Sequence, residues 1–244
     1  MFNRNHIVLC VVVLGLSTFL LRILLANTIN CQAFYIERGS YKVGSDGERK
    51  LFNREIIARR SDGATATVEF ALGRPGFRKV ILPDTTKTWL VDDLRAKTSW
   101  RKMNEEAQAL MNQVAHPIAD CGLGERISGD AVVAGQRTLL VVDDSNPNVQ
   151  EKRWFAPDLG CNIVQYQKLT KQGNLLTEIQ SFKLLVAEPD PQLFDLGASY
   201  AEVLPSELIK RHSAAVGLHQ TSPEYLRYLL EVDREFRATP RQAK

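Results

Sequence analysis

The hydrophobic pattern divides the chain into one unbroken apolar run and a longer part in which apolar and polar residues alternate. Residues 7–26 contain a single charge, Arg22, and a run of this length matches the ~20 residues that a helix needs to cross a bilayer. Arg4 supplies a positive flank, which keeps residues 1–6 in the cytoplasm and places the rest of the chain outside. We therefore assign residues 7–28 as a transmembrane anchor or signal segment.

A cleaved signal peptide is the alternative to an uncleaved anchor. Signal peptides end in small residues with an A-x-A-like pattern, and residues 26–33 fit that pattern poorly. An uncleaved segment would make a single-pass protein of the cytoplasmic membrane, and cleavage would make a secreted one. Both interpretations predict a periplasmic or otherwise extracytoplasmic location for the bulk of the chain.

Beyond the apolar run, short stretches of two-residue alternation are separated by turn residues. The clearest stretch has Ala64, Ala66, Val68, Phe70 and Leu72 on one face. Similar patterns predict strands at 33–43, 51–60, 64–72, 77–82, 88–94, 131–142, 153–169 (with a turn at 157–160) and 175–187. Short strands with short turns are typical of an antiparallel meander.

Two stretches have helical spacing instead. Residues 103–115 form an amphipathic segment, and residues 222–237 place four apolar side chains on one face, namely Tyr225, Leu229, Val232 and Phe236. Ser222 and Pro223 supply an N-cap and a first-turn proline for the second helix, which we expect to pack on the sheet of the same chain. The pattern predicts an α+β protein: an antiparallel β domain at 29–204 with the interposed helix 103–115, then a helical segment at 205–244.

The net charge of +3 conceals an uneven distribution. Residues 33–102 hold fifteen Lys and Arg against nine Asp and Glu, whereas residues 103–244 hold fourteen against nineteen. The basic half suits either anionic lipid headgroups or ordinary solvated strand faces. Nucleic acid is not an expected partner, because the chain has no array of alternating basic and aromatic residues.

Four cysteines are present, and Cys10 lies in the apolar run. In an oxidising compartment Cys121 and Cys161 form the candidate disulfide, with Cys31 left over. The pairing does not follow from the sequence alone. A zinc site is disfavoured because no Cys-x-x-Cys or neighbouring histidine completes one.

Motifs for catalysis are missing from the sequence. There is no G-x-S-x-G, no phosphate-binding loop and no H-E-x-x-H. The adjacent pairs Asp92-Asp93 and Asp143-Asp144 would point to opposite faces of a strand, and residues 143–148 lack the glycine and glutamate of a calcium loop. His116 is interpreted as a helix-terminal residue, and His212 and His219 as surface residues. We therefore predict no enzyme, no catalytic residues, no metal and no cofactor, and the sequence identifies no ligand-binding residues.

Three features resemble the LolA/LolB-like superfamily of bacterial envelope proteins, which includes RseB-type regulators. They are the hairpins at 51–61 and 64–72, the strand pair at 135–142 and 151–154, and the turn at 154–160, within residues 33–190. The resemblance implies a curved antiparallel half-barrel around an apolar cavity that accepts acyl chains, with helices as a lid. A soluble carrier would not be tethered, so an uncleaved anchor would favour a sensor or a fixed acceptor.

These observations lead to two main hypotheses for function. The first is an extracytoplasmic, membrane-anchored, non-catalytic binding protein for an apolar or acylated ligand, a lipid or lipoprotein carrier or sensor. The alternative is a structural or regulatory interaction module of a cell-envelope complex, with envelope proteins as partners and the face of helix 222–237 exposed. A hydrolase would require polar groups that converge in a cleft.

Overall fold

The computed structural model describes residues 32–71, 74–83, 86–103, 119–215 and 222–239. The chain divides into two compact units, Met1–Asn30 and Cys31–Lys244, and only the second contains described residues. The predicted anchor at 7–28 and the predicted helix at 103–115, except Met103, lie outside the described residues, as do His116 and His219. Within the described ranges, no helix combines the length and hydropathy needed to cross a membrane.

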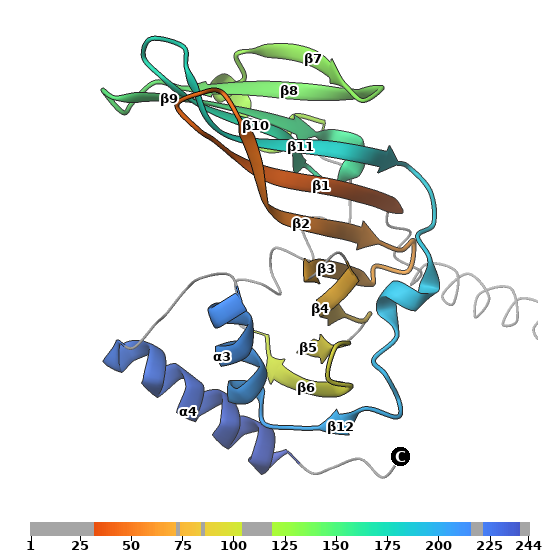
Figure 1. The fold of residues 1–244 in the computed structure, drawn as a ribbon. Helices are drawn as coiled ribbons and strands as arrows, with labels where there is room; N and C mark the ends of the chain where they lie inside the picture. The colour runs from red at the N-terminus through yellow and green to blue at the C-terminus, as the bar shows by residue number, and fades with distance from the viewer. Residues whose placement is uncertain (1–31, 72–73, 84–85, 104–118, 216–221, 240–244) are drawn as a thin grey trace, which may run out of the picture. The chain divides into compact units, whose positions relative to one another are not determined.

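A single twelve-stranded sheet dominates the second unit, in the order β12-β6-β5-β4-β3-β2-β1-β11-β10-β9-β8-β7 (Figure 1). Every pair is antiparallel except β12 with β6. The strands are β1 (Phe34–Val43), β2 (Arg49–Arg59), β3 (Thr65–Ala71), β4 (Arg74–Ile81), β5 (Lys87–Asp92), β6 (Lys97–Lys102), β7 (Gly129–Val133), β8 (Gln136–Asp143), β9 (Val149–Ala156), β10 (Asn162–Thr170), β11 (Leu175–Leu185) and β12 (Ala201–Glu202). The prediction of a large antiparallel sheet is confirmed.

Two meanders, β1–β6 and β7–β11, are joined through the pairing of β1 with β11. Tyr35 lies opposite Leu185 at one end of this pair, and Lys42 lies opposite Thr177 at the other. The two strands are more than a hundred residues apart in sequence, so no local turn sets their register. This one long-range pair makes the two meanders a single sheet.

The predicted strand 131–142 is wrong in one respect, because it is a hairpin of β7 and β8. Ala134 and Gly135 form its two-residue turn with φ of 46° and 82°. Two successive positive φ angles match the twist of a tight hairpin. The sequence signal for this turn was weak because alanine rarely adopts a positive φ. The predicted break at 157–160 is present as the 3₁₀ helix η2 (Pro157–Leu159), which Gly160 ends with φ of 64°.

The sheet buries apolar side chains on both faces. On one face, side chains of β2, β3 and β4 pack under the 3₁₀ helix η3 (Pro191–Phe194); these are Ile56, Ala58, Ala64, Ala66, Val68, Val80 and Phe194. On the other face, side chains from β1, β9, β10 and β11 pack with η2; these are Phe34, Ile36, Ala156, Leu159, Val164 and Leu184. On the predicted apolar face of the strand at 64–72, Ala64, Ala66 and Val68 are buried and Phe70 is partly buried.

Helices α3 (Pro205–Ala215) and α4 (Pro223–Ala238) pack against each other and against β6, and α3 also contacts β5 (Figure 1). Leu229 and Val232 of α4 are buried, and the Ser222 side chain caps this helix by accepting from the Tyr225 N–H at 3.2 Å. The expectation that this helix packs on its own sheet is confirmed. A third 3₁₀ helix, η1 (Gly124–Arg126), follows Cys121.

Candidate functional site

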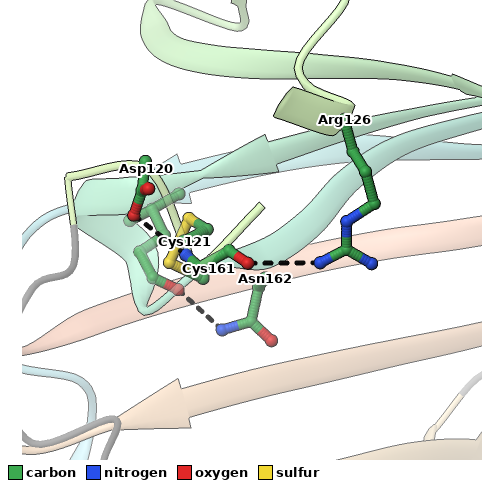
Figure 2. The surroundings of a disulfide bond; sticks show 7 residues. Asp120, Cys121, Arg126, Cys161 and Asn162 are labelled. Atoms are coloured by element: carbon green, nitrogen blue, oxygen red, sulfur yellow. Dashed lines mark hydrogen bonds between the residues drawn. A yellow bond between two sulfur atoms is a disulfide. The ribbon is translucent and has the colours of Figure 1, made fainter. Parts of the chain in front are cut away.

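The structure joins the candidate cysteines, Cys121 and Cys161, in a disulfide with Cα atoms 5.4 Å apart (Figure 2). Both residues have positive φ, 53° and 59°. Asn162 donates from Nδ2 to the Leu159 carbonyl at 2.6 Å, and Arg126 donates to the Gly122 carbonyl at 3.2 Å. The bond thus connects the loop that leads into η1 with the end of η2, whose Leu159 side chain is fully buried.

The adjacent aspartates serve separate structural contacts. Asp92, fully buried, pairs with Arg211 of α3 and accepts from the backbone N–H groups of Leu94 and Arg95. Asp93 pairs with Arg78 on β4. These two carboxylates hold elements together and do not form an acid–base pair.

The Asp143–Asn148 segment is a hairpin loop. Asp143 accepts from Ser145, whose hydrogen bonds lower the pKa of the Asp143 carboxyl. Gln150 donates to Asp144, and this bond likewise lowers the pKa of Asp144. Within the described ranges, no group of three or more His, Cys, Asp or Glu side chains is arranged to hold a metal ion.

A small cleft opens between the two helices and the sheet, and we call it the helix–sheet cleft. Its volume is about 140 Å³. Its lining comes from β4, β5, β6, α3 and α4, and consists of Phe77, Lys79, Leu90, Arg101, Ile209, His212 and Tyr228. The strand residues share one face because Lys79 lies opposite Leu90, and Arg101 lies opposite Thr88, two residues from Leu90.

His212 is a correction to the sequence interpretation, because it is partly buried in this cleft and not a surface residue. Its ring stacks on Phe77 with centroids 4.6 Å apart, and its Nδ1 lies 3.2 Å from Glu69 Oε2. Burial lowers the pKa of His212 to about 4, and nearby Lys79 adds to this effect. The Glu69 carboxylate acts in the opposite direction, but its own charge is partly offset by Lys79 at 3.8 Å. The imidazole is therefore neutral at pH 7.

Two carboxylates that are remote in sequence meet on the same face of the sheet. Glu55 on β2 lies directly opposite Glu69 on β3. Burial raises the pKa of Glu69, and the charge of Glu55 raises it further. Arg38 of β1 balances Glu55 through a 2.9 Å contact. The turn at Ser61-Asp62-Gly63, which joins the predicted strands 51–60 and 64–72, sets this register, so the pairing could have been deduced from the sequence.

A second candidate surface lies on the opposite face of the sheet, and we call it the apolar stripe. It consists of Leu51 on β2 with Leu176, Phe182 and Leu185 on β11, all exposed. The face is defined by two contacts: Leu185 lies opposite Tyr35, and the Phe182 ring lies against Gly39. Six of the nine exposed large hydrophobic residues in the described chain belong to β2, β11 or the residue that follows β11.

Cationic side chains border the apolar stripe. The Arg49 guanidinium lies 4.4 Å from the centre of the Tyr41 ring, and the Lys183 ammonium lies 5.3 Å from that of Tyr35. Tyr41 also meets Phe182 edge to face, with ring centroids 6.4 Å apart. Aromatic and aliphatic surface with basic neighbours can bind an apolar ligand.

Comparisons with known proteins give structural similarity only. No protein-family model matches the sequence, and no curated protein matches it. An uncharacterised conserved protein from Thermus thermophilus is similar at a TM-score of 0.42 and 10% identity, over 72% of this chain and 91% of that one. MucB in its complex with MucA from Pseudomonas aeruginosa is similar at a TM-score of 0.38 and 18% identity, over 75% of this chain and 62% of that one. A putative outer membrane lipoprotein-sorting protein domain from Vibrio parahaemolyticus is similar at a TM-score of 0.25 and 10% identity, over 67% of this chain and 89% of that one. The solved structures similar to this chain thus include proteins of the LolA/LolB/RseB-like group that its sequence resembles, and these likenesses concern the fold alone.

Proposed function

We propose that this chain is an extracytoplasmic, non-catalytic binding protein for an apolar or acylated ligand, a lipid or a lipoprotein. The observation that carries the proposal is the apolar stripe. Leu51 and Phe182 are each 48% exposed, and apolar surface gains roughly 25 cal/mol per Å² when it leaves water. An exposed apolar surface with polar neighbours is typical of a binding site.

The stripe is built to accept an extended apolar group. Gly39 has no side chain, so the Phe182 ring lies directly over the backbone of β1. Leu176 and Leu185 continue the same face toward the two ends of β11. Lys183 at the border suits the anionic groups that accompany acyl chains in lipids, whereas Arg49 pairs with Glu178 at 2.6 Å.

Residues 7–28 would place this domain outside the cytoplasm, as an uncleaved anchor or as a cleaved signal segment. The division into a β domain at 29–204 and a helical segment at 205–244 is part of the same proposal. The Cys121–Cys161 disulfide supports export, because disulfides persist mainly in oxidising compartments. A retained anchor would favour a sensor or fixed acceptor over a soluble carrier.

Native mass spectrometry of the full chain, released from a neutral detergent after export, tests the proposal. The expected result is a lipid-sized adduct that denaturation releases. The double variant Leu51→Ser/Phe182→Ser should lose the adduct, while Val132→Ser, which removes an exposed apolar side chain on β7, should keep it. A clean protein mass that persists after lipid is added back would contradict the proposal.

One observation favours the alternative, an interaction module of an envelope complex. Leu226 and Leu230 lie one turn apart on the outer side of α4 and are 48% and 71% exposed. The alternative hypothesis expected the opposite face of α4, with Leu229 and Val232, to be exposed for a partner, but this face is buried within the chain. A clean mass in the experiment above would make this outer face of α4 the next surface to test.

A further inference from the structure

The helix–sheet cleft contains an arginine whose charge is not balanced by any carboxylate of the described residues. Arg101 donates from Nη1 to the Tyr228 hydroxyl at 2.6 Å, and within the described ranges this phenol is the partner that its guanidinium contacts. The side chain is half-buried at the wall of the cleft. A partly desolvated cation beside an open space is a site for an anion.

We propose that the helix–sheet cleft binds a small oxyanion, a carboxylate or a phosphate monoester, held by Arg101, Lys79 and Tyr228. This inference goes beyond the proposed function. The apolar stripe lies on the other face of the sheet, so the two sites are independent.

The polar groups of the cleft are mostly hydrogen-bond donors. A guanidinium has five N–H donors and an ammonium has three, and Arg101 uses one of its donors on Tyr228. Because the Tyr228 oxygen accepts from Arg101, its own hydrogen can be donated to a ligand. Lys79 contacts Glu69 at 3.8 Å, beyond normal hydrogen-bond length, so its donors are only loosely engaged.

Charge in the cleft favours an anion. Lys79 and Arg101 carry two positive charges, Glu69 carries at most one negative charge, and the neutral His212 carries none at pH 7. With its Nδ1–H directed at Glu69, His212 presents Nε2 as an acceptor. That arrangement suits an oxyanion that also bears a hydroxyl, such as hydrogen phosphate.

The size of the cleft selects the polar end of a ligand. Its volume of about 140 Å³ lies below the ~300–1,000 Å³ of typical small-molecule pockets. Phe77, Leu90 and Ile209 supply its apolar lining. The cleft has room for a carboxylate or phosphate with a few carbon atoms, and not for an acyl chain.

Calorimetric titration of the full chain in neutral detergent at pH 7, with inorganic phosphate and separately with acetate, tests this site. Arg101→Gln should weaken binding by at least about tenfold, because it removes the charged hydrogen-bond donor that faces the anion. Tyr228→Phe should weaken it by a smaller factor and serves as the second variant if Arg101→Gln fails to fold. Arg137→Gln removes the same charge from an exposed position on β8, paired with Asp130, and should leave binding unchanged.

Vesicles distinguish a lipid headgroup from a free anion. Binding to phosphatidic acid vesicles, but not to phosphatidylcholine vesicles, that requires Arg101 would identify a headgroup as the source. Binding of phosphate or acetate that requires Arg101, with no Arg101-dependent vesicle binding, would identify a free anion. The proposal is overturned if none of these probes binds, or if Arg101→Gln binds them as tightly as the unaltered chain.

Discussion

At the scale of single residues, Gly39 shows how a missing side chain shapes a surface. A Cβ atom there would lie 2.7 Å from Phe182 Cζ and 2.9 Å from Leu51 Cδ1. Contacts this short force the neighbours to move, and both contacting atoms are the ends of side chains that are each 48% exposed. The glycine is required by close packing and not by its backbone angles.

Gly39→Ala should therefore displace Phe182 and Leu51 and lower the free energy of unfolding by up to about 1 kcal/mol, below the usual range for overpacking a buried core, because both side chains are exposed. Gly129→Ala on β7 is the matched control, since a Cβ at Gly129 meets nothing within 4 Å. Urea unfolding of both variants measures the difference. Equal midpoints for the two variants would show that Phe182 does not lie over Gly39.

His212 predicts a pH dependence of stability. Burial lowers the pKa of its ring to about 4 in the folded protein, while the unfolded chain keeps the ordinary value near 6.5. Between these values the unfolded state binds more protons, so stability rises with pH through that window and falls as pH drops toward 4. The pKa of Glu69 is raised by burial, so this carboxyl changes stability in the opposite direction with pH, just above pH 4.5.

Unfolding of His212→Gln should therefore show a shallower loss of stability between pH 6.5 and 4 than the unaltered chain. The variant retains Glu69, so the difference between the two curves isolates the histidine. Denaturant midpoints measured at half-unit pH steps provide the comparison. Parallel curves would show that His212 titrates normally and is not buried against Phe77.

At the scale of elements, Arg78 attaches the segment around η3 to the sheet. Its guanidinium meets both carboxylate oxygens of Asp93 at 2.7 Å. It also donates to the carbonyls of Gln192, Leu193 and Asp195 at 3.1, 3.1 and 2.6 Å. One side chain of β4 thus satisfies three backbone groups of a segment more than a hundred residues away.

Arg78→Met should destabilise the protein by about 3–5 kcal/mol, because it leaves Asp93 and the three carbonyls without their buried partner. Arg137→Met, at an exposed ion pair, should cost less than about 1 kcal/mol. Chemical denaturation measures both changes. A loss of similar size in the two variants would contradict the role assigned to Arg78.

At the scale of the whole molecule, the disulfide closes an interval of 40 residues between the loop before η1 and the end of η2. Cross-linking an interval of this length constrains the unfolded chain by about 3–4 kcal/mol on the loop-entropy model. The pairing also accounts for two of the four cysteines in the sequence.

Cys161→Ser should accordingly lower the free energy of unfolding by about 3–4 kcal/mol, and added reductant should lower that of the unaltered chain by a similar amount. Mass spectrometry of the denatured, non-reduced protein should show the loss of two hydrogens, located to a peptide pair containing Cys121 and Cys161. Free thiols at both positions would refute the bond.

Much of the local structure follows from sequence pattern. The turn at Ser61-Asp62-Gly63, the cap at Ser222 and the apolar face of Ala66 and Val68 are all present where the pattern predicts them. Each depends on neighbouring residues: a turn fixes the chain direction, a side-chain oxygen accepts from an N–H three residues on, and alternate residues share a face. The turn at Ala134 was missed because its φ is set by the pairing of β7 with β8.

The antiparallel strands, the amphipathic C-terminal helix and the apolar N-terminal run could thus be predicted from the residue pattern, because they depend on local chemistry and periodicity. The pairing of β1 with β11, the contact of His212 with Glu69 and the meeting of Arg101 and Tyr228 in one cleft become visible only in the folded chain. These contacts join residues far apart in the chain, and their register depends on how whole faces pack together. Both candidate surfaces arise from that packing, so they could be located only after the sheet and its helices were assembled.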